Sequence, residues 1–418
     1  MINIKEKEEC CGCSACVQKC PKQCISLHED TEGFWYPIVN VKSCINCGLC
    51  EKVCPLLDHK EKIYPQKVLA VKNPREDVRT ASSSGGVFLP LAREVIDEGG
   101  VVFGTVFDEC WEVHHVYAEK IEDVYPMMGS KYLQSRIDNT YKEAEQFLKH
   151  GRKVLYVGSP CQITGLRTFL QNKEYPNLLA VDFLCHGVPS PGVWRRYLAE
   201  TYSGYSAGKQ SRRQATAGKN TVLLSSLNAK SPIGDIKFRD KVESGWKKFR
   251  FVIHTKSASK ADRNSVLSSD IHYNNPFMRG FLSDIYLRPS CYECKCKNGV
   301  SHSDLTIGDY WAARTVDQEF DDDKGISLVL VNTDKGHDYL KRLHLEVLPT
   351  TLEKAKLYNG GFSEFVHKHS NRGQFFDLIN SKCTIEEAVA KCLRITRRHK
   401  LINVIKGICY KLSRKMKS

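Results

Sequence analysis

Two copies of one cysteine pattern lie near the start of the chain, and each copy reads C-x2-C-x2-C-x3-C-P. The first copy contains Cys10, Cys13, Cys16 and Cys20, and the second contains Cys44, Cys47, Cys50 and Cys54. Three thiolates at this spacing can bind three corners of one iron-sulfur cube, whereas the fourth, held away by the following proline, reaches the other cube. The pattern therefore predicts two 4Fe-4S clusters.

The same spacing predicts crossed ligand sets. The first cluster takes Cys10, Cys13, Cys16 and Cys54, and the second takes Cys44, Cys47, Cys50 and Cys20. Disulfides or zinc are the alternative uses of these cysteines, but disulfides need an oxidising compartment and zinc sites usually need only two C-x2-C pairs. We therefore interpret residues 1–62 as a bacterial-type two-cluster ferredoxin domain. Cys11 and Cys24 are expected to pack beside the clusters as small apolar residues.

The length of the chain and the lack of a recognisable targeting signal predict a larger, cytoplasmic protein. The chain has 418 residues, whereas about 60 suffice for a two-cluster ferredoxin, so the remainder can form at least one further core. No apolar run precedes Cys10, and no apolar stretch approaches the roughly 20 residues of a spanning helix. Nineteen cysteines without an export signal favour a reducing cytoplasm.

The positive charge is concentrated in two segments. The net charge is +14, and residues 204–265 and 391–418 each contribute an excess of ten basic residues, which leaves the rest of the chain slightly acidic. A nucleic-acid-binding protein with zinc knuckles would fit this charge, but it does not fit the paired C-P runs. We therefore expect no nucleic-acid partner.

Beyond a polar linker near residues 60–66, hydrophobic periodicity predicts alternating strands and helices. Strands are expected at 68–71, 101–107, 113–118, 153–157 and 178–184, and helices at 87–98, 139–150 and 162–171. A second hairpin is expected from 236–241 and 248–253. Few apolar residues occur in 203–232, which predicts a mobile excursion, and 257–269 is a second polar stretch. The predicted class is α+β, with the ferredoxin domain followed by a mixed α/β domain over 66–382.

A second group of cysteines lies further along the chain. Cys161 and Cys185 follow predicted strands directly, at the place where α/β folds carry functional groups. Cys291 and Cys294 form a C-x2-C pair that needs partners from elsewhere, with Cys296 as a crowded third thiol. Pairing Cys161 and Cys185 with Cys291 and Cys294 gives four ligands for a third cluster. Buried inert cysteines are the alternative.

Several sequence blocks after the ferredoxin region occur in one order between about residues 60 and 375. They are Ser83-Ser-Gly-Gly86, Gly129-Ser-Lys-Tyr-Leu-Gln-Ser135, Pro160-Cys-Gln162, Cys185-His-Gly-Val-Pro-Ser190, Phe238-Arg-Asp-Lys241 with Gly245-Trp246, and Arg288-Pro-Ser-Cys291 through Ser303-Asp-Leu-Thr-Ile-Gly-Asp-Tyr-Trp311. Jointly they resemble the family of coenzyme F420 hydrogenase/dehydrogenase β subunits, in the version fused to a ferredoxin module. The resemblance implies a flavoprotein with FAD close to an iron-sulfur cluster.

The residues expected to bind FAD belong to two of these blocks. Ser82, Ser83, Ser84, Gly85 and Gly86 precede a helix and offer hydroxyls and amides to a pyrophosphate. Gly129, Ser130, Lys131, Gln134 and Ser135 form the second block, in which Lys131 is expected to offer a cation to phosphate or to the reduced flavin. A simple helix cap and a solvated lysine are the alternatives.

The combined prediction is an iron-sulfur flavoprotein oxidoreductase. Electrons would pass from ferredoxin or another donor through the clusters to FAD and then to an organic substrate. The family includes coenzyme F420 enzymes and members associated with surface-polysaccharide synthesis, which suggests a small-molecule or lipid-linked sugar substrate. A non-catalytic electron-transfer subunit is the alternative. His186 is the candidate proton donor, because it follows a predicted cluster ligand at a strand end.

The end of the chain, residues 383–418, is predicted to be a basic amphipathic tail. Leu401, Ile405, Ile408 and Leu412 fall on one helical face, and six lysines and arginines surround it. Such a helix would hold the protein reversibly at the inner face of an anionic membrane. Packing of the same face on the protein itself or on a partner is the alternative.

Overall fold

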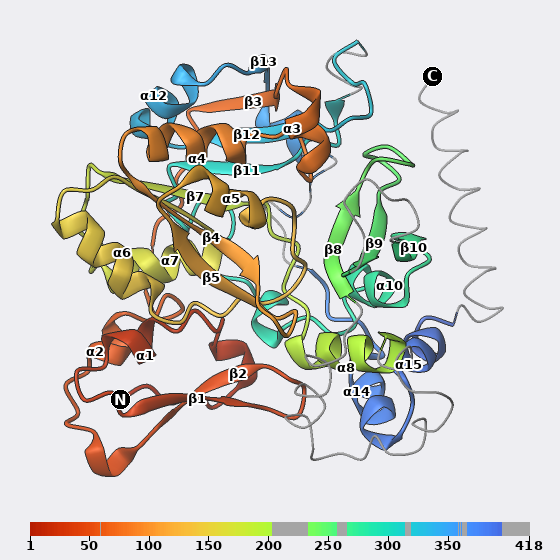
Figure 1. The fold of residues 1–418 in the computed structure, drawn as a ribbon. Coiled ribbons are helices and arrows are strands. Elements are labelled where there is room, and N and C mark those ends of the chain that lie inside the picture. The colour runs from red at the N-terminus through yellow and green to blue at the C-terminus, as the bar shows by residue number, and fades with distance from the viewer. Residues whose placement is uncertain are drawn as a thin grey trace, which may run out of the picture.

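The structure is a computed structural model that describes residues 1–58, 60–202, 233–256, 266–313, 319–357, 359, 361 and 366–394. The predicted excursion at 203–232 and the amphipathic face of the tail lie outside the described residues. The chain forms a mixed α/β body built around a large sheet, with the N-terminal module below it and a small sheet with helices beside it (Figure 1).

The N-terminal module is a β-hairpin with short helical turns around the two cysteine runs. Its elements are η1 (Lys7–Glu9), α1 (Ala15–Lys19), β1 (Ile25–Glu29), β2 (Trp35–Val39), η2 (Val41–Ser43) and α2 (Leu49–Lys52). The two strands pair antiparallel, as predicted. Gly33 in the hairpin turn has a φ of +84°, and a Cβ there would lie 2.5 Å from the Cα of Gly192. Glycine therefore permits the hairpin to lie against the body.

Among the described residues, eight strands form one mixed sheet in the order β13-β3-β12-β11-β7-β6-β4-β5. The strands are β3 (Lys67–Lys72), β4 (Val101–Phe107), β5 (Val113–Ala118), β6 (Val154–Gly158), β7 (Leu178–Phe183), β11 (Leu305–Asp309), β12 (Ser327–Val331) and β13 (Glu346–Thr350). The neighbours β4, β6, β7 and β11 run parallel, and the outer pairings are antiparallel. The predicted hairpin of β4 and β5 is confirmed. Central strands such as β12 are buried along their whole length, which explains their continuous apolar sequences.

Helices cover both faces of this sheet. The helical elements of the body are α3 (Glu76–Ala81), α4 (Phe88–Asp97), α5 (Ile121–Val124), η3 (Tyr125–Met127), α6 (Thr140–Lys149), α7 (Pro160–Phe169), α12 (Asp334–Arg342) and α13 (Leu352–Lys356). Apolar residues of α4 and α12 form one core with the sheet, and those of α6 and α7 form a second core with its other face. The second core also contains Cys11, Cys13, Ala15 and Val53 of the N-terminal module. The module is therefore packed on the α6/α7 layer.

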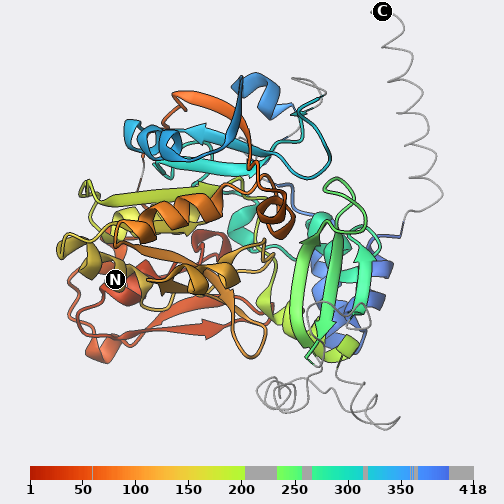
Figure 2. The same cartoon turned by 45° about the horizontal axis from the view of Figure 1, so that its top comes forward.

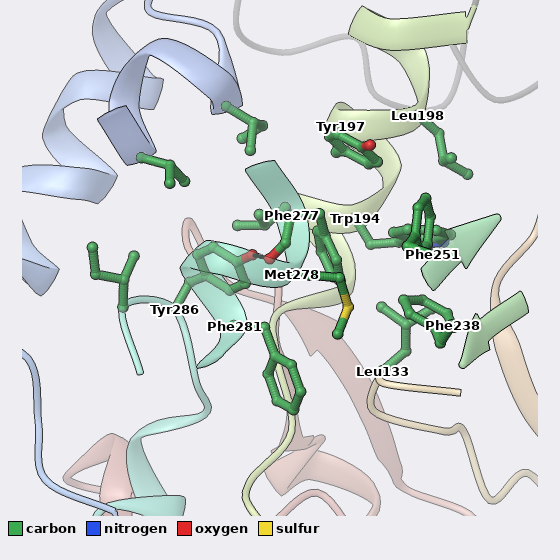
Figure 3. Close-up of a cluster of buried hydrophobic side chains, with 14 of the residues drawn as sticks. Leu133, Trp194, Tyr197, Leu198, Phe238, Phe251, Phe277, Met278, Phe281 and Tyr286 are labelled. Carbon is green, nitrogen blue, oxygen red and sulfur yellow. Dashed lines mark hydrogen bonds between the residues drawn. The ribbon is translucent and has the colours of Figure 1, made fainter. Parts of the chain in front are cut away.

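A three-stranded antiparallel sheet and four helices lie beside the large sheet (Figure 2). They are β8 (Ile233–Asp240), β9 (Arg250–Thr255), β10 (Val266–Ile271), α8 (Pro191–Tyr202), α10 (Pro276–Leu282), α14 (Arg372–Ser381) and α15 (Ile385–Cys392), with η6 (Pro289–Cys291) leading back to the large sheet. Their core is rich in aromatic rings, including Trp194, Phe238, Phe251 and Phe277 (Figure 3). The predicted hairpin of β8 and β9 is confirmed.

Two expectations need correction. The stretch 257–269 was interpreted only as polar, with no strand, but its last residues belong to β10, whose backbone pairs with β9. The first turns of the predicted tail belong to the body, since Ile385, Ala388 and Val389 of α15 are buried in its aromatic core. No helix among the described ranges is long and apolar enough to cross a membrane.

Candidate iron-sulfur and cofactor site

Each predicted set of four N-terminal thiols lines one cavity. One cavity is lined by Cys20, Cys44, Cys47 and Cys50, together with the backbone around Gly48. A second cavity is lined by Cys10, Cys13, Cys16 and Cys54. The fourth cysteine of each run thus lies with the other run, which is the crossed arrangement that the spacing predicts. The residues present therefore fit two cubes, here called cluster one (Cys10 set) and cluster two (Cys20 set).

Backbone amides approach the thiols of the cluster-two cavity. The amide of Ile2 donates to the sulfur of Cys50 over 3.2 Å, and the amide of Asn46 donates to that of Cys44 over 3.5 Å. Hydrogen bonds to sulfur raise the reduction potential of a cluster by stabilising its more negative state. Gly48 caps α2 with a φ of +73°, a backbone conformation that glycine adopts without strain.

The four later cysteines come from three segments at one edge of the large sheet. Cys161 lies in the first turn of α7, directly after β6, and Cys185 follows the parallel neighbour β7. Cys291 ends η6, and its sulfur accepts a hydrogen bond of 3.4 Å from the amide of Val188, three residues after Cys185. Cys294 packs against the same core as Cys161. The topology therefore brings together the four residues that the sequence grouped.

The thiols of this inner group affect one another. Burial raises the pKa of Cys185 well above its usual value, and the neighbouring thiolates of Cys291, Cys161 and Cys294 raise it further. Burial and Cys294 likewise raise the pKa of Cys291 to about 12. Four partly buried thiolates this close together need a bound cation to remain charged, which an iron-sulfur cluster supplies. Within the described residues no three ligating side chains surround a single ion, but a cube does not require this, because each thiolate binds a different iron.

Cluster one lies directly against the inner group. The Cys11 thiol is the largest cause of the raised pKa of Cys161, and the same thiol interacts with Cys13. A Cβ on Gly165 of α7 would lie 3.1 Å from the sulfur of Cys13, so the helix that carries Cys161 touches the cluster-one loop. Cys11 is therefore not only a packing residue, as the sequence suggested, but is the sulfur between two sets of ligands. Its position beside Cys10 gave no sign of this.

Arg288 joins the N-terminal module to the inner group. Its side chain is fully buried, three residues before Cys291. Its Nε donates to the carbonyl of Cys10 over 2.7 Å, its Nη1 to Oε1 of Gln134 over 2.8 Å, and its Nη2 to the carbonyl of Trp35 over 3.0 Å. Burial lowers the pKa of Arg288, but the Cys10 thiolate and its neighbours outweigh this and the net shift is upward. The sequence motif contained this arginine, but nothing in the motif indicated its partners.

The Ser82–Gly86 segment is held by the start of β12. The hydroxyl of Ser84 donates to the carbonyl of Ile326 over 2.7 Å, and the amide of Gly85 donates to Oγ of Ser327 over 3.0 Å. The hydroxyl of Ser83 accepts from the amide of Ser130 over 2.6 Å, which joins the two predicted FAD-binding blocks. Ser82 donates to the carbonyl of Val78. Several groups expected to bind phosphate therefore already have partners in the protein.

Cationic side chains that the sequence did not single out surround this segment. The ammonium of Lys241 donates to the carbonyls of Arg79, Ser84 and Lys324 over 2.5, 3.0 and 2.7 Å. Burial lowers its pKa to about 7, with Arg239 and Arg79 acting in the same direction. Burial also lowers the pKa of Lys131 to about 8. The segment is therefore short of negative charge.

Two buried guanidinium groups have N–H atoms left over beside this segment. Arg239 pairs with Asp309 at the end of β11, and Arg79 pairs with Asp322 over 2.7 Å. Nε and Nη2 of Arg239, and Nε and Nη1 of Arg79, are buried without a hydrogen-bond partner. Such orphaned cationic donors are costly unless an anion binds them. The pyrophosphate of FAD would be such an anion. Arg79 and Arg239 are not among the residues that the sequence predicted to bind FAD.

The remaining predicted residues lie elsewhere. Gln134 donates to the carbonyl of Cys11 over 3.1 Å, so it contacts the cluster-one loop. The hydroxyl of Ser135 lies 2.7 Å from Nδ1 of His115, whose pKa burial lowers to about 4. Nε2 of His186 lies 2.6 Å from Oδ1 of Asp284, and its ring contacts the edge of Phe281.

Comparison with known proteins agrees with this arrangement. Residues 151–350 match the family described as the C-terminal part of the coenzyme F420 hydrogenase/dehydrogenase β subunit, and residues 9–56 match the 4Fe-4S dicluster domain. One subunit of the F420H2 dehydrogenase of Methanosarcina mazei is 24% identical over 197 residues, which cover 44% of this chain and 55% of that protein. Coenzyme F420-dependent sulfite reductase of Methanocaldococcus jannaschii is 28% identical over 177 residues, 39% of this chain and 26% of that protein.

The matches cover only part of each relative. The chain spans about half the length of the first relative and about a quarter of the second. A chain of the F420-reducing [NiFe] hydrogenase complex from Methanosarcina barkeri aligns with 78% of this chain and 91% of its own length, at 15% identity and a TM-score of 0.44. A similarity of that size does not define a shared fold. The matches to the two family models show that the chain is an iron-sulfur redox protein.

We expect Arg288→Lys to loosen the N-terminal module. Lysine lacks the planar fork that reaches three acceptors, so at least one charged hydrogen bond is lost, at about 1.5–3 kcal/mol. Hydrogen exchange in residues 25–39 should accelerate, with iron content unchanged. The matched control is Arg75→Lys, an exposed pair with Asp77, which should change stability by about 0.5 kcal/mol or less. Equal protection of β1 and β2 in both variants would contradict the role of Arg288.

Proposed function

We propose that the chain is a flavin-dependent oxidoreductase that couples an external electron carrier to an organic substrate, because residues 151–350 match the C-terminal part of the coenzyme F420 hydrogenase/dehydrogenase β subunit. The observation that carries the proposal is the row of thiol groups from cluster two, through cluster one, to Cys161 at the sheet edge. This row supports a single path for electrons. The donor is ferredoxin or another one-electron carrier.

The order of the centres follows from burial and contact. Cys47 of cluster two is exposed, whereas Cys13 of cluster one is buried and lies beside α7. Electron tunnelling falls steeply with distance, so the carrier would exchange electrons with cluster two and the inner group would receive them through cluster one. Cys11 lies at the step between cluster one and Cys161.

FAD is proposed to bind at the carboxyl edge of β11, beside the inner group. Arg79, Arg239 and Lys241 would hold its pyrophosphate, and Lys131 lies near the same loop. When bound, FAD supplies the conversion between one-electron and two-electron chemistry that a hydride-accepting substrate requires. The stacked rings of Trp246 and Trp311, with centroids 4.5 Å apart, border Arg239 and shield this region from water.

His186 remains the proposed proton donor. Its hydrogen bond to Asp284 fixes the orientation of the ring, and its backbone follows the proposed ligand Cys185. The substrate class, a small molecule or a lipid-linked sugar of surface-polysaccharide synthesis, rests on the family resemblance alone.

A non-catalytic electron-transfer subunit is the second candidate, because one relative is itself one subunit of a dehydrogenase. The purified protein, with reduced ferredoxin and candidate substrates, separates the two functions: turnover without any partner supports the enzyme. The His186→Gln protein should lose that turnover while its clusters and flavin are still reduced. Wild-type turnover in this variant would exclude the proton-donor role.

A peripheral position at an anionic membrane belongs to the same proposal and rests on the sequence of residues 395–418. Flotation with anionic liposomes at low salt, comparing the full chain with a chain that ends at residue 394, tests it. Equal flotation of the two proteins would exclude it.

We expect reconstituted protein to contain about twelve irons, three 4Fe-4S clusters, and one FAD. Cys291→Ser should remove or disturb the inner cluster and leave FAD oxidised when ferredoxin is the donor, because the path is interrupted at its last step. Cys47→Ser should remove one outer cluster and spare the flavin. The control is Cys110→Ser, in the β4–β5 loop, with full iron content. Iron near eight in the wild-type protein would contradict the third cluster.

We also expect FAD affinity to fall as pH rises above about 7. Lys241 has a pKa of about 7 in the free protein, and an anion nearby raises it, so binding takes up a proton. The bound state then has the higher pKa, and affinity is greatest below pH 7 and is lost as pH rises through the bound pKa. A shift of one unit corresponds to about tenfold in affinity.

Flavin fluorescence titrations of apoprotein at pH 6.5 and 9 measure this difference. The Lys241→Gln protein should show at pH 6.5 the weak affinity that the wild-type protein shows at pH 9, with a small remaining slope from Lys131. A wild-type affinity that is constant over this range would contradict the assignment of Lys241.

A further inference from the structure

The surface around cluster two combines exposed apolar side chains with an accessible cluster ligand. Val41 is 66% exposed and Ile45 is 57% exposed, and they flank Cys44. Cys47, two residues after Ile45, is also exposed. Neighbouring exposed apolar residues rimmed by polar ones are typical of interaction surfaces, and Ile38 and Leu57 are the other large apolar side chains of the module that are more than half exposed.

The charges that border these residues are basic. Lys22, Lys42 and Lys52 are exposed, and none of them forms an ion pair with any residue in the described part of the chain. Glu51 is the nearby acid, and its carboxylate accepts from the Met1 ammonium over 2.7 Å.

Other acids of the module face away from this surface. Asp30 and Glu32 in the hairpin turn bind Lys7 and Arg372, and Glu29 binds Arg195 of α8. Their charges are therefore neutralised within the protein, between the module and the body. Lys22, Lys42 and Lys52 therefore leave uncompensated positive charge around cluster two; Lys5 and Lys62 are the other exposed lysines of residues 1–62 without an ion pair among the described residues.

We propose that Lys22, Val41, Lys42, Ile45 and Lys52 form the docking surface for a small acidic electron-carrier protein. This rests on the proposed function in one respect, the presence of cluster two, and deepens it by naming the site and the charge of the partner. An apolar centre with a charged rim is the composition of transient protein interfaces. The basic rim steers an acidic carrier, and the apolar centre lets it approach Cys47.

The step that follows docking is the transfer of one electron. The reduced carrier is oxidised by one electron and cluster two is reduced by one, with no bond made or broken. Electrostatic steering raises the rate constant of association by roughly ten-fold or more at low salt, and screening removes this gain as ionic strength increases.

The experiment is anaerobic stopped-flow reduction of the full-length, cluster-loaded protein by a reduced two-cluster ferredoxin of net negative charge. The readout is the loss of cluster absorbance, which needs neither FAD nor a substrate. For Lys22→Glu/Lys42→Glu we expect the second-order rate constant to fall by about tenfold at low salt and the difference to shrink at high salt. Reduction by dithionite should be unchanged.

The matched control is Lys120→Glu/Lys354→Glu, which has the same change in net charge at exposed lysines of the body. This control should keep the wild-type rate. The Lys22→Glu/Lys42→Glu protein is called the cluster-two variant. If its rate constant of reduction by ferredoxin is unchanged, or if the control loses as much, the proposal is overturned. Restoration of the rate constant of the cluster-two variant by a ferredoxin of net positive charge would support it.

The same readout tests whether an anionic lipid surface, instead of a carrier protein, binds at this surface. Anionic vesicles that slow the ferredoxin reaction of the wild-type protein and the control, but not of the cluster-two variant, would assign this surface to a membrane and overturn the proposal. Absence of FAD or of turnover would contradict the proposed flavoenzyme function. The rates of cluster reduction by ferredoxin would still test the docking surface.

Discussion

The buried guanidinium of Arg288 is the contact on which the arrangement of redox centres depends. It comes from the segment that carries Cys291 and donates to the backbone of Cys10 and Trp35, so one side chain ties an inner ligand to cluster one and to the ferredoxin-like hairpin. A fully buried charge is costly unless it is paired, and the thiolates of both ligand sets provide that pairing. The charge of the clusters and the position of the module are therefore stabilised by the same group.

The carboxyl edge of the parallel strands explains why the inner site lies where it does. Cys161 and Cys185 follow β6 and β7, and Asp309 ends β11; because these three strands are parallel neighbours, the residues lie at one edge although they are far apart in sequence. Ligand sites of α/β sheets commonly occupy this position. The cationic residues come instead from β8 and α3, outside this row, and they close the site from the side.

Patterns with a fixed local spacing were predictable from the sequence. The crossed sets of N-terminal cysteines, the β4–β5 hairpin and the grouping of Cys161 with Cys291 all follow from spacing or from strand order. Long-range partners were not predictable. Arg239 and Lys241 belong to a block that the sequence singled out without a role, Arg79 to none, and only the fold buries them together beside Ser84. Gln134 was assigned to FAD with its block, yet its amide binds the carbonyl of Cys11, because Gly12 leaves room for it.

The glycine at position 165 has a consequence for the speed of the protein. Helix α7 carries Cys161 at one end and lies against Cys13 at Gly165, where a Cβ would already lie 3.0 Å from the Cβ of Cys13. Any side chain there would push the cluster-one loop away from the helix by a fraction of an ångström or more. Because tunnelling probability decays exponentially with separation, the absence of a Cβ at Gly165 keeps the electron-transfer distance between cluster one and the Cys161 end of α7 short. In the proposed electron path, this separation would limit the rate at which the inner cysteine group receives electrons from cluster one.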